Sequence, residues 1–169
     1  MQQDNALKVV QVGCGSMGRG WIDNALKTPG IQLVGLVDVQ RKAAEAAAEK
    51  FQLPPSIVFD TLADALAKTG ADVVFDVTIP AAHESVVTEA LRAGRHVLGE
   101  KPMSETLDSA RRMVAAAKKA GKTYAVTQNY RYQPAIRSLK SFFVRRRYWP
   151  CAGSPRRFLP GPPFRRLPR

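Results

Sequence analysis

Apolar residues along the chain fall into blocks whose spacing switches between strand-like and helix-like periods. Short runs rich in valine, isoleucine and leucine hold few polar residues, as strands buried on both faces of a parallel sheet require. Longer segments between them have a helical period, and several are rich in alanine, which has the highest helix propensity. The predicted strands are the run at 8–12 and the segments 31–37, 57–59, 71–78, 95–98 and 123–127. The predicted helices are 17–27, 41–51, 62–68, 81–93 and 106–120.

This alternation predicts the fold class. Strands separated by helices of about ten to fifteen residues form βαβ units with parallel strands. Right-handed crossovers then give an α/β fold with a doubly wound, mostly parallel sheet of the Rossmann type, and ligands bind at the carboxyl ends of its strands. We predict a nucleotide-binding domain over 1–133, the start of a connecting helix over 134–143 and a dissimilar tail over 144–169.

Three glycines follow the first predicted strand at G-x-G-x-x-G spacing. In such a turn, Gly13 allows the sharp reversal, Gly15 lets backbone amides approach a pyrophosphate, and Gly18 lets the next helix pack closely on the sheet. The amino terminus of that helix favours an anion, because its N–H groups are free and its dipole is positive there. The same residues are also compatible with a turn that binds no ligand.

An acidic residue ends the second predicted strand. Asp38 lies twenty positions after Gly18, where a carboxylate can accept hydrogen bonds from the adenosine ribose and repel a 2′-phosphate. This spacing favours NAD as the cofactor, although Arg41 close by leaves NADP open. Taken alone, Asp38 is equally compatible with an ordinary loop aspartate.

Length and composition narrow the class of protein further. A chain of 169 residues can bury one sound core, and a hydrophobic content of 45% is ordinary for a globular protein. No segment reaches the ~20 apolar residues of a membrane helix, and no secretory signal is evident, so we expect a cytoplasmic protein without a membrane partner. Cys14 and Cys151 are predicted to be free thiols, and no metal site is predicted.

Polar residues cluster where the fourth, fifth and sixth predicted strands end. His83 taken alone is more typical of a helix cap or a solvated residue than of a catalyst. Lys101 taken alone is typical of a solvated loop, yet beside a cleft a lysine can exchange a proton with a hydroxyl or carbonyl. The three stretches are Thr78-Ile79-Pro80-Ala81-Ala82-His83, Gly99-Glu100-Lys101-Pro102 and Gln128-Asn129-Tyr130-Arg131-Tyr132.

Together, the glycine turn, Asp38 and these three stretches resemble the N-terminal half of the Gfo/Idh/MocA oxidoreductases, over about residues 7–140. The most specific part is Glu100-Lys101-Pro102, whose Lys-Pro bond is often cis in such proteins. The resemblance implies hydride transfer between bound NAD(P) and a carbon of a sugar- or polyol-like substrate, with Lys101 contacting the substrate hydroxyl and assisting proton transfer. It implies pyrophosphate contacts at Gly13, Gly15, Ser16, Met17 and Gly18, a ribose contact at Asp38, and a nicotinamide side lined by Thr78, Pro80, His83, Glu100 and Asn129.

The net charge of +12 is concentrated at the end of the chain. Residues 1–136 hold 16 bases and 14 acids, whereas ten bases and no acid follow. Residues 142–169 contain eight arginines and six of the 12 prolines. One interpretation is a disordered basic tail, and a second is a nucleic-acid or membrane tether. We favour a shifted reading frame, because a one-base displacement permits Gly-Ala-Ile-Gly near Trp149 and YLGPHFGGF over 159–168.

The resemblance also implies a second α/β domain, which we do not find in this sequence. We therefore expect a truncated oxidoreductase that binds its cofactor without turnover, and a homo-oligomer only with the second domain. Two alternatives are a non-catalytic dinucleotide-binding or interaction module and, ranked last, nucleic-acid binding through the basic tail. DNA sequence beyond codon 169 that stops in every frame would contradict the frameshift.

Overall fold

A computed structural model describes residues 6–145 of the protein. The chain divides into two units, the first ending at Gln128 and the second beginning at Asn129. The predicted frameshifted tail from residue 146 onward, with Trp149 and Cys151, lies outside the described residues.

The first unit is built on a six-stranded sheet in which every neighbouring pair of strands is parallel. The strands are β1 Leu7–Val12, β2 Ile31–Val37, β3 Val58–Phe59, β4 Val73–Asp76, β5 His96–Gly99 and β6 Tyr124–Val126. Their order, β3-β2-β1-β4-β5-β6, confirms the predicted doubly wound α/β fold. The chain reverses its direction of winding between β1 and β4, so a crevice opens at the carboxyl ends of these two strands.

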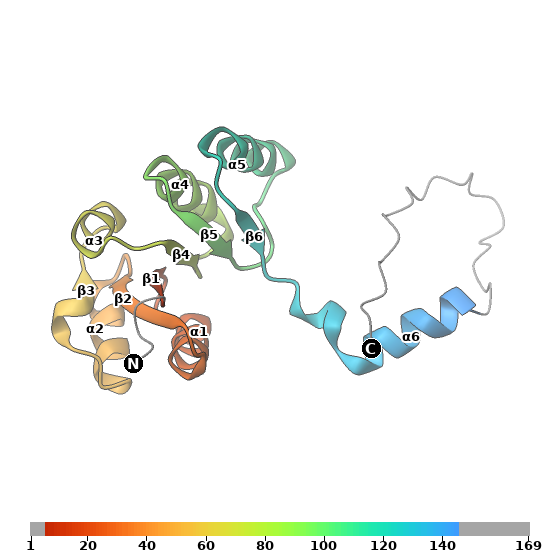
Figure 1. The fold of residues 1–169 in the computed structure, drawn as a ribbon, viewed down its shortest axis with the longest axis horizontal. Helices are drawn as coiled ribbons and strands as arrows, with labels where there is room; N and C mark the ends of the chain where they lie inside the picture. The colour runs from red at the N-terminus through yellow and green to blue at the C-terminus, as the bar shows by residue number, and fades with distance from the viewer. Residues whose placement is uncertain (1–5, 146–169) are drawn as a thin grey trace. The chain divides into compact units, whose positions relative to one another are not determined.

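Five helices cover the two faces of this sheet (Figure 1). Side chains of α1 Ser16–Lys27 and α2 Arg41–Lys50 share one buried cluster with residues of β1, β2 and β4. Side chains of α3 Leu62–Thr69, α4 Pro80–Arg92 and α5 Leu107–Ala120 share the other. Val9 and Val10 show why the strands are apolar throughout, since they are both buried but belong to opposite clusters.

Local sequence explains where several elements begin. Thr61 caps α3, because its side chain accepts a hydrogen bond from the Asp64 N–H. The predicted strand 57–59 begins only at Val58, because Pro55–Ile57 form the 3₁₀-helix η1. The predicted strand 71–78 is shorter than expected, since the ladder ends just after Asp76 and the Asp76 carboxylate bonds back to Thr78.

The second unit contains the 3₁₀-helix η2 Asn129–Tyr132 and the helix α6 Pro134–Arg145. α6 starts at the predicted residue and continues beyond 143. Within residues 6–145, no helix is both long and apolar enough to cross a membrane.

Candidate cofactor-binding and catalytic site

Two glycines of the turn between β1 and α1 have no room for a side chain. Gly13 has a φ of +95°, and a Cβ there would lie 2.4 Å from the Val77 carbonyl oxygen, just after β4. A Cβ at Gly18 would lie 2.1 Å from the Gly13 carbonyl oxygen. Both glycines are therefore required by the packing of the turn itself.

Gln11 braces the same turn from beneath, a role the sequence reasoning missed. Its side chain is fully buried, and its Nε2 donates to the carbonyl oxygens of Gly13 and Gly18, each at 2.9 Å. The available indication was a single amide among the valines at 9–12. Because a buried amide must find partners, it points to nearby backbone that lacks its own.

Gly15 differs from the other two glycines of the motif. A Cβ at Gly15 would meet no atom within 4 Å, so its lack of a side chain is not required by the protein's own packing. Gly15, Ser16 and Met17 are exposed, no side chain caps α1, and the first turn of α1 holds no acid. The first N–H groups of a helix have no partner inside it, so this end of α1 presents donors to an anion. These features fit a pyrophosphate.

Asp38 lies at the mouth of the turn. Its Oδ2 accepts the Cys14 N–H at 2.7 Å, and its Oδ1 accepts the Gln40 N–H at 2.9 Å. The carboxylate is thus fixed by two backbone donors while each oxygen keeps a further lone pair. Arg41 is engaged elsewhere, because its guanidinium pairs with Glu45 at 2.8 Å and with Asp60.

The loop after β4 contains a buried polar cluster. His83 Nδ1 lies 2.8 Å from Asp76 Oδ2, and the Thr78 hydroxyl donates to Asp76 Oδ1 at 2.6 Å. His83 is 1% exposed and Asp76 0%. Interpreting His83 alone as a cap or a solvated residue was therefore wrong, because its ring is buried against the Asp76 carboxylate. From the sequence, Asp76 was predicted only as part of the strand 71–78.

His83 is nevertheless incompletely satisfied. Its Nε2 is buried without a hydrogen-bond partner among the residues described. Pro80 occupies the first turn of α4, where its missing N–H costs nothing. Asp76, Thr78 and His83 thus form a rigid support beneath the loop at the crevice, and a nicotinamide contact at Thr78, Pro80 or His83 stays a prediction.

The loop after β5 is anchored on both sides. Glu100 N–H donates to the Asp76 carbonyl oxygen at 2.9 Å. Its carboxylate accepts the Trp21 Nε1–H at 2.9 Å and the Lys101 N–H at 3.0 Å. The Lys101-Pro102 peptide is cis, and both residues are exposed. The sequence reasoning did not single out Trp21.

One predicted residue lies outside this cluster. Asn129 opens η2 in the second unit, so its part in the site stays a prediction. Among residues 6–145, no three His, Cys, Asp or Glu side chains gather as metal ligands do.

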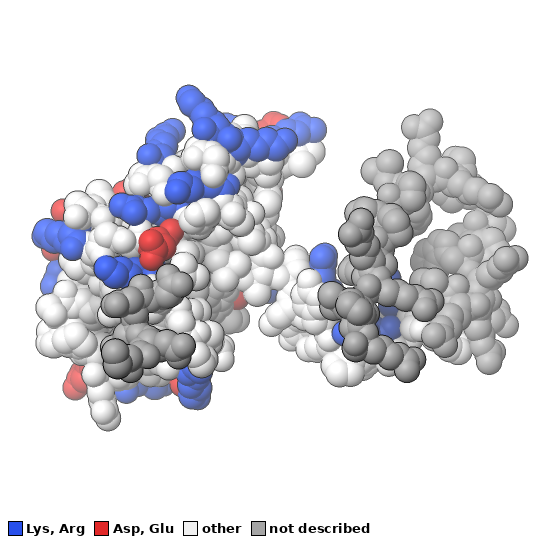
Figure 2. Space-filling model, viewed as in Figure 1, with Lys and Arg blue, Asp and Glu red and all other residues white. Residues whose placement is uncertain are grey.

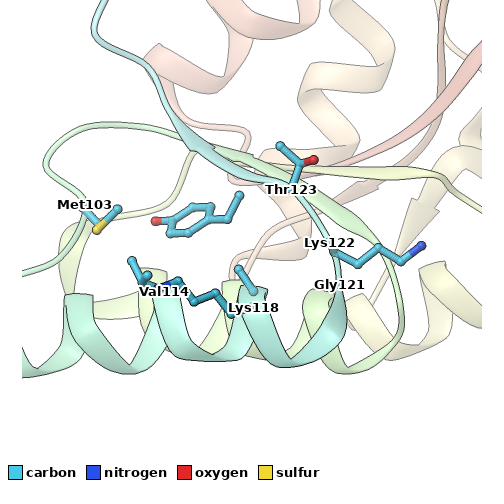
Figure 3. Close-up of a pocket in the computed structure, with 8 residues that line it drawn as sticks. Met103, Val114, Lys118, Gly121, Lys122 and Thr123 are labelled. Atoms are coloured by element: carbon cyan, nitrogen blue, oxygen red, sulfur yellow. The ribbon is translucent and has the colours of Figure 1, made fainter. Parts of the chain in front are cut away.

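A separate cleft of about 370 Å³ lies between α5 and the segment leading into β6, and none of the predicted site residues lines it (Figure 3). Met103 borders it opposite Val114 and Lys118 of α5. Burial, assisted by the negative charge of Asp76, raises the pKa of Tyr124 in this cleft to about 12. Lys and Arg side chains gather on the α5 side of the first unit (Figure 2). Lys118 and Lys119 lie in the last turn of α5, and Lys122 follows it.

Sequence comparison decides the family. Residues 7–128 match the Gfo/Idh/MocA family, described as an oxidoreductase family with an NAD-binding Rossmann fold. The chain belongs to this family. The match covers most of the first unit and confirms both the resemblance and the prediction of an NAD-binding domain.

Members of the Gfo/Idh/MocA family resemble the chain over the same part. The inositol 2-dehydrogenase/D-chiro-inositol 3-dehydrogenase of Lacticaseibacillus casei is 35% identical over 136 residues, which are 79% of this chain and 39% of that protein. The crystal structure of myo-inositol dehydrogenase from Lactobacillus casei, in complex with NAD(H) and myo-inositol, is similar with a TM-score of 0.74 and 33% identity, covering 83% of this chain and 42% of that one. The WlbA dehydrogenase of Bordetella pertussis, in complex with NADH and UDP-GlcNAcA, has a TM-score of 0.77 and 28% identity, covering 88% and 42%.

The chain thus spans about two fifths of the length of these relatives. Within that span lies the glycine turn, Asp38 and the Glu100-Lys101-Pro102 loop. The contacts described above therefore belong to the part of the chain that matches the Gfo/Idh/MocA family.

Proposed function

We propose that this chain is the cofactor-binding half of an NAD-dependent oxidoreductase that acts on a sugar- or polyol-like substrate. The observation that carries the proposal is the open space above Gly15, at the uncapped start of α1 and beside the fixed carboxylate of Asp38. An acid at this place favours NAD over NADP, because it would repel a 2′-phosphate. The dehydrogenases similar to this chain include proteins named for inositol and one solved with a UDP-sugar.

When bound, NAD supplies a nicotinamide carbon that accepts or gives up a hydride. The protein's own residues hold and orient it. Backbone amides at Gly15, Ser16 and Met17 would bind the pyrophosphate together with the dipole of α1. Asp38 would accept a ribose hydroxyl with the lone pairs left free by its two backbone donors.

Lys101 is the residue we assign to proton transfer. Its side chain is exposed at the carboxyl end of β5, next to the strand that ends in the buried Asp76 cluster. Its ammonium makes no ion pair with any residue from 6 to 145, so its three donors are available to a substrate hydroxyl. Holding a proton at that oxygen assists hydride movement at the attached carbon.

Water access to this lysine shapes the expected activity. Hydride transfer is favoured where water is excluded, and Lys101 is exposed in this chain. We therefore expect the chain by itself to bind the dinucleotide without sustained turnover.

Calorimetric titration of the full chain with NADH, and separately with NADPH, tests the proposal. We expect saturable NADH binding that is tighter than NADPH binding. Lys101→Met is the matched control, because it should leave NADH affinity and stability unchanged. Absence of saturable binding by either dinucleotide would contradict the proposal, and sustained reduction of NAD with a panel of polyols would contradict the expected lack of turnover.

A further inference from the structure

We propose that Trp21 is a positioning residue for Lys101 and that it acts through the carboxylate of Glu100. The inference rests on the proposed function only because it takes Lys101 to be the residue that contacts a substrate. The link itself is a property of the free protein.

Trp21 is held firmly on α1, the helix that begins at the glycine turn. Its ring packs edge-on against Phe75 of β4, with ring centroids 5.2 Å apart and an interplanar angle of 74°. Such edge-to-face pairs have a preferred geometry, so the contact fixes the indole orientation. The indole N–H then points to the loop after β5, where it meets Glu100 Oε1 at 2.9 Å.

Glu100 passes this fixed position to the next residue. While one of its oxygens accepts the indole N–H, Oε2 accepts the backbone N–H of Lys101 at 3.0 Å. A carboxylate is planar and rigid, so anchoring one oxygen also places the other. Hydrogen bonds to a charged acceptor are roughly twice as strong as those between neutral groups.

The indole also gives Glu100 a partner other than the adjacent ammonium. A glutamate next to a lysine could pair with it, and the substrate would then lose that lysine as a donor. In the structure, both carboxylate oxygens are engaged by N–H groups, and Lys101 Nζ makes no ion pair within residues 6–145. Trp21 therefore joins the helix of the cofactor turn to the backbone of the proton-transfer residue.

Three substitutions separate this link from packing. Trp21→Phe keeps an aromatic ring against Phe75 but removes the N–H donor together with part of the ring. Phe75→Leu is the matched control, because it weakens the ring contact and leaves the indole donor in place. Glu100→Gln can still accept the indole N–H but replaces one oxygen with an amide that cannot accept from Lys101.

Hydrogen exchange of backbone amides in lysine-labelled protein, followed by NMR, measures the effect directly. Lys101→Arg assigns the Lys101 resonance. Lys8 provides an internal reference, since its N–H donates to a carboxylate oxygen of Asp72 at 2.9 Å, far from the loop in sequence. We expect Trp21→Phe and Glu100→Gln to accelerate exchange at Lys101 about tenfold, which corresponds to the loss of one charged hydrogen bond, while Lys8 is unchanged. Phe75→Leu keeps the indole donor and loosens only the ring contact that orients it, so it should accelerate exchange at Lys101 less than Trp21→Phe does.

Each outcome decides a separate question. Unchanged exchange at Lys101 in Trp21→Phe, or equal acceleration of Lys8 and Lys101, would overturn the positioning role. Failure of NADH to bind the wild-type chain, with the Lys101 effect intact in the free protein, would count against the proposed function alone.

Discussion

The three glycines of the turn occupy different environments, and this difference gives a quantitative test of cofactor binding. Replacing Gly15 with alanine adds a methyl group that meets no protein atom within 4 Å. The backbone of Gly15, at φ −64° and ψ −163°, is open to alanine without strain. The cost to stability should stay below about 1 kcal/mol, the scale of helix-capping effects.

The same methyl group would stand where backbone amides approach the pyrophosphate. Losing one hydrogen bond to a charged group costs about 1.5–3 kcal/mol, so the dissociation constant for NADH should rise about ten- to hundredfold. Isothermal calorimetry measures this affinity, and urea unfolding of the same sample measures stability.

Two further glycines of α1 are controls. A Cβ at Gly18 would lie 2.1 Å from backbone, so Gly18→Ala should destabilise the domain by about 3 kcal/mol, as overpacked cores do. A Cβ at Gly20 would meet no atom within 4 Å. Because alanine has the higher helix propensity, Gly20→Ala should stabilise the domain by about 1 kcal/mol and leave NADH affinity unchanged. Wild-type NADH affinity in a folded Gly15→Ala variant would refute the assignment of the pyrophosphate to this turn.

Three further predictions concern other groups. Asp76→Leu removes the carboxylate that pairs with buried His83, so it should lower the free energy of unfolding by about 3 kcal/mol, measured with urea. A change under about 0.5 kcal/mol would contradict the structural role of this pair. The hydrogen bond from Arg112 lowers the pKa of Glu84 from 4.5 to about 2, so the stability lost in Glu84→Gln at pH 7 should vanish as the pH falls toward 2. Burial, assisted by the negative charge of Asp38, raises the pKa of Cys14 from 9.0 to about 12. Folded protein without Cys151 should therefore resist iodoacetamide at pH 8, and rapid labelling would contradict this. The free energy of unfolding should fall as the pH rises from 9 toward 12, because the thiol ionises first in the unfolded chain.

Much of the fold could be predicted because its determinants are local. Strands such as β1 and β2 are predictable from their mostly apolar, valine- and leucine-rich sequences. Helices such as α5 are predictable from their alanine content and from a threonine cap, Thr106, whose side chain accepts the Ser109 N–H. The ends of elements were less predictable. β4 is shorter than its apolar run because the Asp76 carboxylate bonds to Thr78, a contact that the pattern does not encode.

The candidate site also combines features that local sequence predicts with contacts that it does not. Motif spacing predicted the glycine turn and Asp38 as site elements, because a tight phosphate-binding turn needs glycines and an acid at particular intervals. The Glu100-Lys101-Pro102 loop was singled out only by its resemblance to the family. It could not show that His83 is buried against a carboxylate, or that the carboxylate of Glu100 is shared between an indole and a backbone amide. Such partners lie far apart in the chain or on different elements, and they meet only once the parallel sheet has aligned its strand ends. The sequence alone therefore determined the fold class, the family and the motifs on which the proposed site rests. The tertiary structure decided which polar groups are buried in support of the loops and which stay exposed, because those contacts depend on how the strand ends align.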